Sequence, residues 1–150
     1  MSVDMFLKLK ANGADVVGDS NSKIFKGWIE VESFSWGVQT ARDAGGLSSG
    51  RRSYKEFRWV NRHQKSSLLI WKALILNQPI EAEFDIVRAS SDGGSEVFLK
   101  FLFTEARISS FDMAGEAEGP MEEIGLVFNS VEGEDPINGI TVQDTLSTGV

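Results

Sequence analysis

Apolar side chains alternate with polar ones in several short segments of this chain, and this period of two is the feature that most limits its fold. Successive side chains of a β-strand point to opposite faces of a sheet, so alternation indicates a strand with one buried face. The clearest case is IEAEFDIVRA, where Ile80, Phe84 and Ile86 alternate with acidic residues. Similar patterns predict six or seven strands, at residues 3–10, 26–39, 54–62, 80–89, 96–109, 122–132 and, for a short seventh, 139–146.

One segment, SSLLIWKALILNQP at residues 66–79, follows a different pattern. Ser66 or Ser67 can cap the start of a helix, and Asn77 followed by Pro79 can end it. The helix between them is apolar around nearly its whole circumference. Such a helix must be buried, either by its own domain or by a neighbouring molecule.

The strands outnumber the helix, and the links between consecutive strands are typical of hairpins, such as SSDGGS at residues 90–95. We therefore predict a mainly β fold, a small antiparallel β-barrel with one flanking α-helix. Closing the sheet into a barrel would remove its exposed edges. The chain has 150 residues and no internal repeat, which favours a single domain.

Three of the predicted strands carry large apolar residues on both faces. In residues 26–39, Ile29 and Val31 share one face, and three aromatic residues share the other. A small barrel has only one inward face to fill, so the second set needs another place. Because a large exposed apolar patch invites association, we infer a self-associating barrel. The aromatic candidates for a subunit interface or for the core are Trp28, Phe34, Trp36, Trp59 and Phe98.

A β-bulge near Glu32 and Ser33 is the alternative for residues 26–39. An extra residue there would switch the phase of the strand, and all of its aromatic side chains would then face one core. Both interpretations remain open for this strand. The same double-faced character in two further strands favours the subunit interface for the chain as a whole.

The stretch TARDAGGLSSGRRS, residues 40–53, is polar and rich in glycine, serine and arginine. Loops of this length are uncommon inside a compact domain unless they have a function. Its GxxxxG spacing is not a P-loop, because two arginines follow and a strand rather than a helix comes next. We expect a flexible loop with a basic end, whose partner is an acidic surface such as one on another copy.

Composition excludes several classes of function. The net charge of −7 opposes binding to nucleic acid through a broad basic surface. The absence of cysteine excludes disulfides, thiolate catalysis and thiolate metal sites. The longest apolar run, residues 68–76, is interrupted by Lys72 and is too short to span a bilayer. The N-terminus lacks the features of a cleaved signal peptide, and we expect no membrane insertion.

Few residues are candidates for catalysis or metal binding. His63 is the only histidine, and its polar neighbours are typical of a structural or solvated side chain. The acidic clusters at residues 116–123 and 132–135 lack EF-hand spacing and are interpreted as solvated faces. Nothing marks Glu81 and Glu83 as a glycosidase pair. We predict no enzymatic activity, no metal and no cofactor; a barrel hydrolase with an acidic cleft is the alternative from a different class.

Several segments together resemble the hemolysin-coregulated protein (Hcp) family. They are VDMFLKL at residues 3–9, KGWIEVESFSWG at residues 26–37, the helix at residues 66–77, and ISSF followed by the strand EIGLVF. They occur in order, with family-like spacing, over most of the chain. Residues 112–123 are acidic where the family is rich in glycine and serine. Residues 134–150 also depart from the family pattern, so we predict one domain over residues 1–150 with a flexible or atypical tail.

The resemblance implies a structural subunit of the inner tube of a bacterial type VI secretion system. Copies would form hexameric rings that stack into a tube inside a contractile sheath and baseplate, capped by a VgrG-like spike. Small effector proteins could occupy the lumen. The protein would lie in the bacterial cytoplasm before firing and would then be secreted without a cleaved signal peptide. Neither nucleic acid nor a membrane would be a partner.

The resemblance also implies site residues. The loop between the second and third strands would reach towards the neighbouring ring, and Ser35, in phase with Ser33, would face the lumen. An effector-carrying ring that builds no long tube and the tube subunit of a phage-tail-like contractile particle are the alternatives. The ring-stacking residues would be Arg42, Asp43, Gly45, Gly46, Leu47, Arg51 and Arg52.

Overall fold

A computed structural model describes residues 3–42 and 48–146, with side chains described for residues 3–40 and 52–146. Within this part the chain is mainly antiparallel β with one helix, as predicted. The elements are β1 (Val3–Ala11), β2 (Ala14–Val16), β3 (Ile29–Val31), β4 (Ser33–Ser35), β5 (Val38–Arg42), β6 (Ser48–Tyr54), β7 (Phe57–Arg62), α1 (Ser67–Ile75), β8 (Ile80–Ala89), β9 (Ser95–Ala114), β10 (Met121–Asp135) and β11 (Ile140–Thr145).

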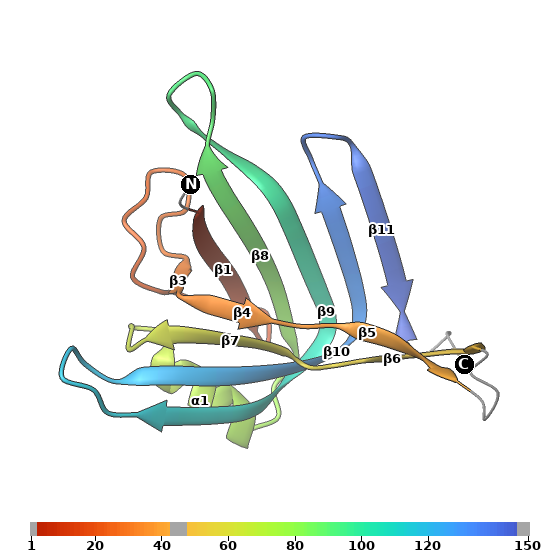
Figure 1. The fold of residues 1–150 in the computed structure, drawn as a ribbon. Helices are drawn as coiled ribbons and strands as arrows, with labels where there is room; N and C mark the ends of the chain where they lie inside the picture. The colour runs from red at the N-terminus through yellow and green to blue at the C-terminus, as the bar shows by residue number, and fades with distance from the viewer. Residues whose placement is uncertain (1–2, 43–47, 147–150) are drawn as a thin grey trace.

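The main sheet runs in the order β2-β1-β8-β9-β10-β7-β4, with β11 beside β10 and β3 beside β1, and its pairs are antiparallel. Only Glu32 separates β3 from β4, so this segment ties the β1 end of the sheet to the β7 end. The sheet is therefore curled like a barrel (Figure 1) but is bridged by two three-residue strands rather than closed by a full strand pair.

The long strands β9 and β10 change direction and so belong to both layers of the curled sheet (Figure 1). In β9, Glu105 has a φ of 51°, next to Ala106, where the pairing with β8 ends. In β10, the register against β9 shifts between Gly125 and Leu126. Such irregularities bend a strand and re-aim its side chains. They allow β10 to pair with β7 through its first part and with β11 through its last part.

Residues 26–39 are not one double-faced strand. The backbone bends at Glu32, whose N–H donates to the carbonyl of Val60 at 2.8 Å, and the chain changes partner from β1 to β7. The phase switches at this bend. Buried Ile29 therefore shares one core with the partly buried side chains of Phe34 and Trp36. The structure thus supports the phase-switch alternative for this segment, and most of its aromatic side chains are core rather than interface.

Trp28 belongs to a second, smaller cluster. Its ring meets Phe25 edge-on with centroids 4.9 Å apart, and Phe25 stacks on Phe6 at 4.5 Å. Val87 and Val97 complete this cluster. The segment between β2 and β3 therefore packs on the outer face of β1 and β8, and Trp28 is accounted for within one copy.

The other two double-faced segments are resolved in a similar way. Tyr54 ends β6 and Phe57 begins β7, so both can pack against the same core, and Trp59 is fully buried. In β9, the register against β8 shifts by one residue around Phe98. Phe98 is partly buried, and the guanidinium carbon of Arg88 lies 5.0 Å from its ring centroid. The aromatic residues therefore give no separate argument for self-association.

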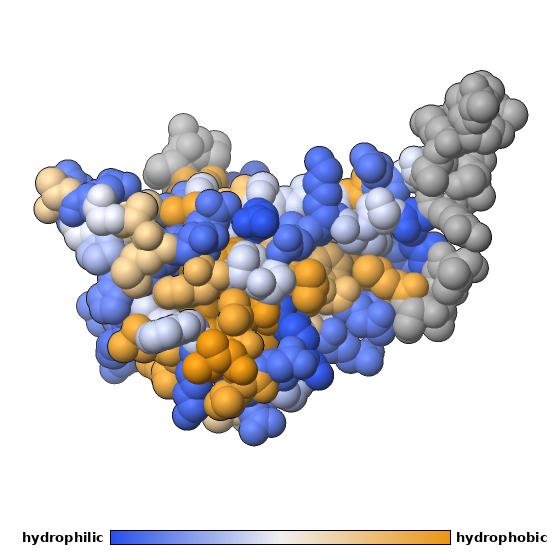
Figure 2. All heavy atoms as spheres, turned by 90° about the horizontal axis from the view of Figure 1, so that it is seen from below, coloured by the Kyte–Doolittle hydropathy of each residue, from blue (hydrophilic) through white to orange (hydrophobic). Residues whose placement is uncertain are grey.

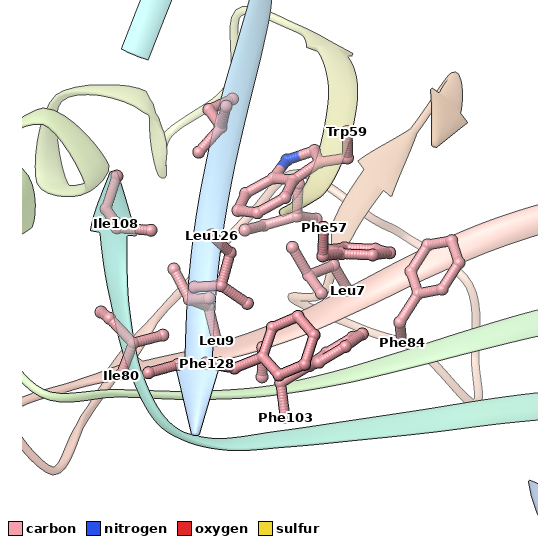
Figure 3. Packing of buried hydrophobic residues seen from close by; sticks show 14 of the residues in the cluster. Leu7, Leu9, Phe57, Trp59, Ile80, Phe84, Phe103, Ile108, Leu126 and Phe128 are labelled. Atoms are coloured by element: carbon pink, nitrogen blue, oxygen red, sulfur yellow. The ribbon is translucent and has the colours of Figure 1, made fainter. Parts of the chain in front are cut away.

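The core lies between the two layers, where side chains of β1, β7, β8, β9 and β10 converge (Figure 3). Phe57 is at its centre, with ring centroids 4.7 Å from Phe103 and 5.2 Å from Phe84. From α1, Ile70 and Ala73 pack into the same cluster. Fully buried large side chains in this cluster include Leu7, Leu9, Ile29, Phe57, Trp59, Ile70, Ile80, Phe84, Phe103, Ile124 and Leu126.

Two short segments differ from the sequence-based expectation. Asn12 and Gly13 both have positive φ (54° and 82°) and form a tight turn between β1 and β2, in a stretch predicted as loop. Asn-Gly is a strong hairpin signal, but the strands were predicted from the alternation of apolar residues, which this dipeptide does not enter. Residues 133–135 extend β10 beyond its predicted end at residue 132, whereas β11 (Ile140–Thr145) agrees with the short seventh strand predicted at residues 139–146. Residues 147–150 lie outside the description.

Candidate interaction surfaces

Ser33 and Ser35 lie exposed on β4, on either side of the partly buried Phe34. They pair with Val60 and Arg58 of β7. Residues directly opposite each other on paired strands share a face, so the serines lie beside the outward side chains of β7.

Arginines and carboxylates continue this polar face. Arg58 lies 3.2 Å from Glu56 and 3.5 Å from Glu123. Arg62 lies 3.4 Å from Glu32 and 3.5 Å from Glu118. Exposed ion pairs of this kind contribute little to stability. Their effect is to make the face hydrophilic, with more acidic than basic groups.

The predicted loop at residues 40–53 is largely a β-hairpin. β5 pairs with β6 as a two-stranded sheet that extends away from the core (Figure 1). Polar side chains did not prevent this, because backbone groups form the ladder whatever the side chains are. Arg42 lies in β5 and Arg51 in β6, but their side chains are outside the described part. The other predicted stacking residues, Asp43, Gly45, Gly46 and Leu47, lie entirely outside it.

Arg52 is held by the chain's own β11. Its Nε and Nη2 donate to the two carboxylate oxygens of Asp144 at 2.5 and 2.6 Å, and the Tyr54 hydroxyl donates to Asp144 at 2.7 Å. These hydrogen bonds, that of Arg52 first, lower the pKa of Asp144 to about 2. The acidic partner expected for this basic segment is, for Arg52, within the same copy, where it fixes β6 against β11.

A buried carboxylate connects α1 to the sheet. Glu122 is 1% exposed and accepts from the Asn61 amide at 3.0 Å and from the Ser67 hydroxyl at 2.7 Å. Its other oxygen lies 3.2 Å from Nδ1 of His63, which is exposed. We had interpreted Glu122 as part of a solvated acidic face. Strand alternation could have revealed its inward direction, since Ile124 and Leu126 share its parity.

The outer face of α1 is apolar and exposed. The helix buries only Ser67, Ile70 and Ala73. Leu74 is partly buried, and the other large apolar side chains of this region are between 45% and 64% exposed. Figure 2 shows this side of the molecule with an apolar patch bordered by polar residues. Within the described residues, no helix is both long and apolar enough to span a membrane. The exposed residues of this face, here called the helix patch, are Leu68, Leu69, Trp71, Ile75 and Leu76.

An apolar pocket of about 270 Å³ is lined by residues of β9, β10 and β11 together with Trp36, before β5, and Tyr54, at the end of β6. Phe101 and Val131 form its buried floor, and Ile140 and Val142 form an exposed apolar rim. Carboxylates stand at the edge of this pocket, here called the β11 pocket. Its lining residues are Trp36, Tyr54, Leu99, Phe101, Val131, Gly133, Glu134, Asp135, Ile140, Val142 and Asp144.

These features define a curled β-barrel protein whose distinctive surfaces are a polar face, an apolar helix and an apolar pocket. Among the described residues, no group of three His, Cys, Asp or Glu side chains is placed to hold a metal ion. The surfaces suit assembly and binding.

The family model described as "Type VI secretion system effector, Hcp" matches residues 6–134 of the chain. The chain therefore belongs to this family of type VI secretion proteins, which confirms the resemblance found in the sequence. A comparison with curated proteins found no match.

Solved structures of Hcp proteins have the same fold. A double mutant of Hcp1 from E. coli EAEC 042 has a TM-score of 0.90 at 20% identity, covering 97% of this chain and 99% of that one. Hcp1 from Salmonella typhimurium has a TM-score of 0.79 at 21% identity, with 97% and 96% covered. The secreted protein Hcp3 from Pseudomonas aeruginosa has 0.77 at 15%, with 94% and 98% covered.

Proposed function

We propose that this chain is a structural subunit of the inner tube of a type VI secretion system. Copies form hexameric rings, and stacked rings form a tube that is expelled with the spike. The family match over residues 6–134 carries this proposal. The polar face around Ser33 and Ser35 supports it, because a water-filled lumen needs a hydrophilic wall. The barrel itself has a mechanical role rather than an enzymatic one.

The partners follow from this role. Other copies contact the chain within the ring and between rings, and a VgrG-like spike, a sheath and a baseplate contact the assembled tube. The protein lies in the bacterial cytoplasm before firing and outside the cell afterwards. Small effector proteins bind in the lumen, against the face that carries Ser33 and Ser35.

Assembly is tested on the purified protein by mass photometry and negative-stain microscopy. We expect particles with the mass of six copies and an annular outline at micromolar concentration. A strictly monomeric protein over the whole accessible concentration range would refute the tube subunit.

Effector binding is tested separately with Ser35→Glu. The added charge and bulk should abolish copurification of a small effector while the six-copy particle remains. Ser95→Glu is the matched control, because Ser95 is also exposed but lies at the start of β9. Effector retention in Ser35→Glu would remove the lumen assignment and leave the ring intact.

A further inference from the structure

The helix patch is too apolar to be left in water by chance. Leu68, Trp71 and Ile75 follow one another at helical spacing and form a stripe along the outer side of α1. Burying one such side chain contributes about 1.5–3 kcal/mol. An exposed stripe of this kind marks an interaction site.

The same chain carries a surface that fits this stripe. The β11 pocket has an apolar floor and an apolar rim, with Val142 68% exposed. Its volume of about 270 Å³ exceeds the roughly 150 Å³ of an apolar cavity that holds benzene. One large apolar side chain of a helix would fill it.

The charges around the two surfaces are opposite. On α1, exposed Lys72 lies between Leu69 and Leu76, which are one turn before and after it. At the β11 pocket, the acidic Asp135 is on the same face of β10 as Val131 and Gly133 of the lining. Glu134 has the opposite parity and pairs with Lys100 on the other face of the sheet. A lysine at the edge of the helix would therefore meet the Asp135 carboxylate at the pocket, which favours this pairing over a helix–helix contact that would bring two lysines together.

The two surfaces cannot meet within one copy. Figure 1 places α1 beneath the lower layer and β11 at the opposite, upper side of the molecule. A contact between them must join two copies through unlike surfaces. Repeating such a heterologous contact produces a ring if the rotation closes, and a filament if it does not.

We propose that the helix patch of one copy docks into the β11 pocket of the next copy, with Lys72 beside Asp135. The inference rests on the proposed ring-forming function and names the surfaces that build the ring. It also explains why β11 has apolar side chains facing an open pocket and why α1 is apolar all round.

The test uses the absence of cysteine from this chain. Ile75→Cys and Val142→Cys are purified separately, mixed and oxidised with copper phenanthroline. We expect a disulfide-linked dimer that contains one chain of each variant, and a ladder of covalent oligomers from the double variant. Ile24→Cys, at 69% exposure, is the control for either position. It should yield little mixed product, because a disulfide forms only when the Cα atoms are within about 7 Å.

Charge reversal gives an independent measurement. Lys72→Glu should raise the concentration needed for half-assembly by about tenfold, and Asp135→Lys in the same chain should restore much of the loss. Ile75→Ser should weaken assembly while leaving the unfolding midpoint of the monomer unchanged. Ile70→Ala, at a buried position of the same helix, should lower that midpoint.

The outcomes separate the two proposals. Rings in the native mass spectrum without the mixed disulfide, or with a disulfide between two Ile75→Cys chains as the main product, would overturn the docking but leave the tube subunit intact. A mixed disulfide in open filaments would support the docking and overturn the hexameric ring. Neither rings nor mixed disulfide would overturn both.

Discussion

Gly18 shows how closely the segment before β3 packs on that strand. A Cβ at this position would lie 2.6 Å from both the Ile29 Cα and the Trp28 carbonyl oxygen. Both are backbone atoms, which cannot move aside as the end of a side chain can. The N–H of Gly18 also donates to the carbonyl of Gly27 at 2.7 Å. The position therefore requires glycine for space.

We predict that Gly18→Ala lowers the free energy of unfolding by about 2 kcal/mol, the range of overpacked sites. Gly115→Ala is the control, because no atom lies within 4 Å of its Cβ position; it should change the same quantity by less than about 0.5 kcal/mol. Denaturant titrations of both variants measure the difference. Equal midpoints for the two would show that the segment shifts without cost.

Asp85 is a buried acid on the outward side of β8. It is 3% exposed, and its pKa is raised to about 7, first by burial and then by the charge of Glu83, while Lys100 acts in the opposite direction. Lys100 itself lies 3.5 Å from Glu83. The folded state thus holds a proton that the unfolded chain loses near pH 4.

This pKa predicts a specific pH dependence. Between about pH 4 and pH 7, the folded state binds more protons at Asp85 than the unfolded state, so this group lowers the free energy of unfolding as pH rises. Asp85→Asn should therefore gain stability over the native chain at pH 8 and much less at pH 4. Thermal unfolding at the two pH values measures it, with exposed Asp112→Asn as control. An equal stability difference between Asp85→Asn and the native chain at the two pH values would contradict the raised pKa of Asp85.

At the scale of elements, hydrogen bonds to Asp144 join the β5–β6 hairpin to β11. Arg52 and Tyr54 both donate to Asp144, and the Trp36 and Tyr54 rings are stacked with centroids 6.4 Å apart. The segment predicted as a loop is a hairpin, because the backbone groups of β5 and β6 pair with each other. Arg52 then fixes this hairpin to β11 through Asp144. Only the three-dimensional pairing of β10 with β11 places Asp144 opposite Arg52, 92 residues away.

We predict that Arg52→Met loosens the hairpin without unfolding the core. Amide hydrogen exchange should accelerate in β6 and β11 but remain unchanged in β8. Because Arg52 and Tyr54 lower the pKa of Asp144 from 3.8 to about 2, protection in the native chain should persist on acidification and be lost as pH falls through that value. Arg58→Met, which removes only exposed ion pairs, is the control. Unchanged exchange in both strands would show that backbone pairing alone holds the hairpin.

At the scale of the whole molecule, the polar face, the helix patch and the β11 pocket lie on different sides of one curled sheet. A ring subunit needs such a division, because its lumen, its neighbours and the adjacent rings are met by different surfaces. In our proposal, the β5–β6 hairpin is the surface that meets the adjacent ring. Residues 43–47, which connect β5 to β6 along the chain, would contact the next ring.

We predict that replacing residues 43–47 with Asn-Gly shortens tubes without preventing rings. Asn-Gly is a favoured two-residue hairpin connection, so β5 and β6 keep their pairing while the tip is removed. Ring mass in native mass spectrometry should be unchanged, and tube length in electron micrographs should fall. Tubes of normal length would show that stacking uses another surface.

The sequence by itself determined most of the strands, the helix and the family. Ile80–Ala89 was predicted at its observed bounds because alternation records one buried face. α1 was predicted because residues 68–76 are all apolar except Lys72. The resemblance to the Hcp family depended on local segments and their order along the chain, and both are properties of the sequence alone. The Asn-Gly dipeptide at residues 12 and 13 also indicates a hairpin in the sequence, although this stretch was predicted as a loop.

The tertiary structure decided which way the side chains point and which charges are satisfied. Alternation reports faces only while a strand keeps its phase, and the bend at Glu32 resets that phase by exchanging β1 for β7 as partner. Glu122 and Arg52 look like solvated charges in the sequence, yet each meets partners brought together by distant strands. Long-range pairing sets these contacts, and no local pattern encodes it.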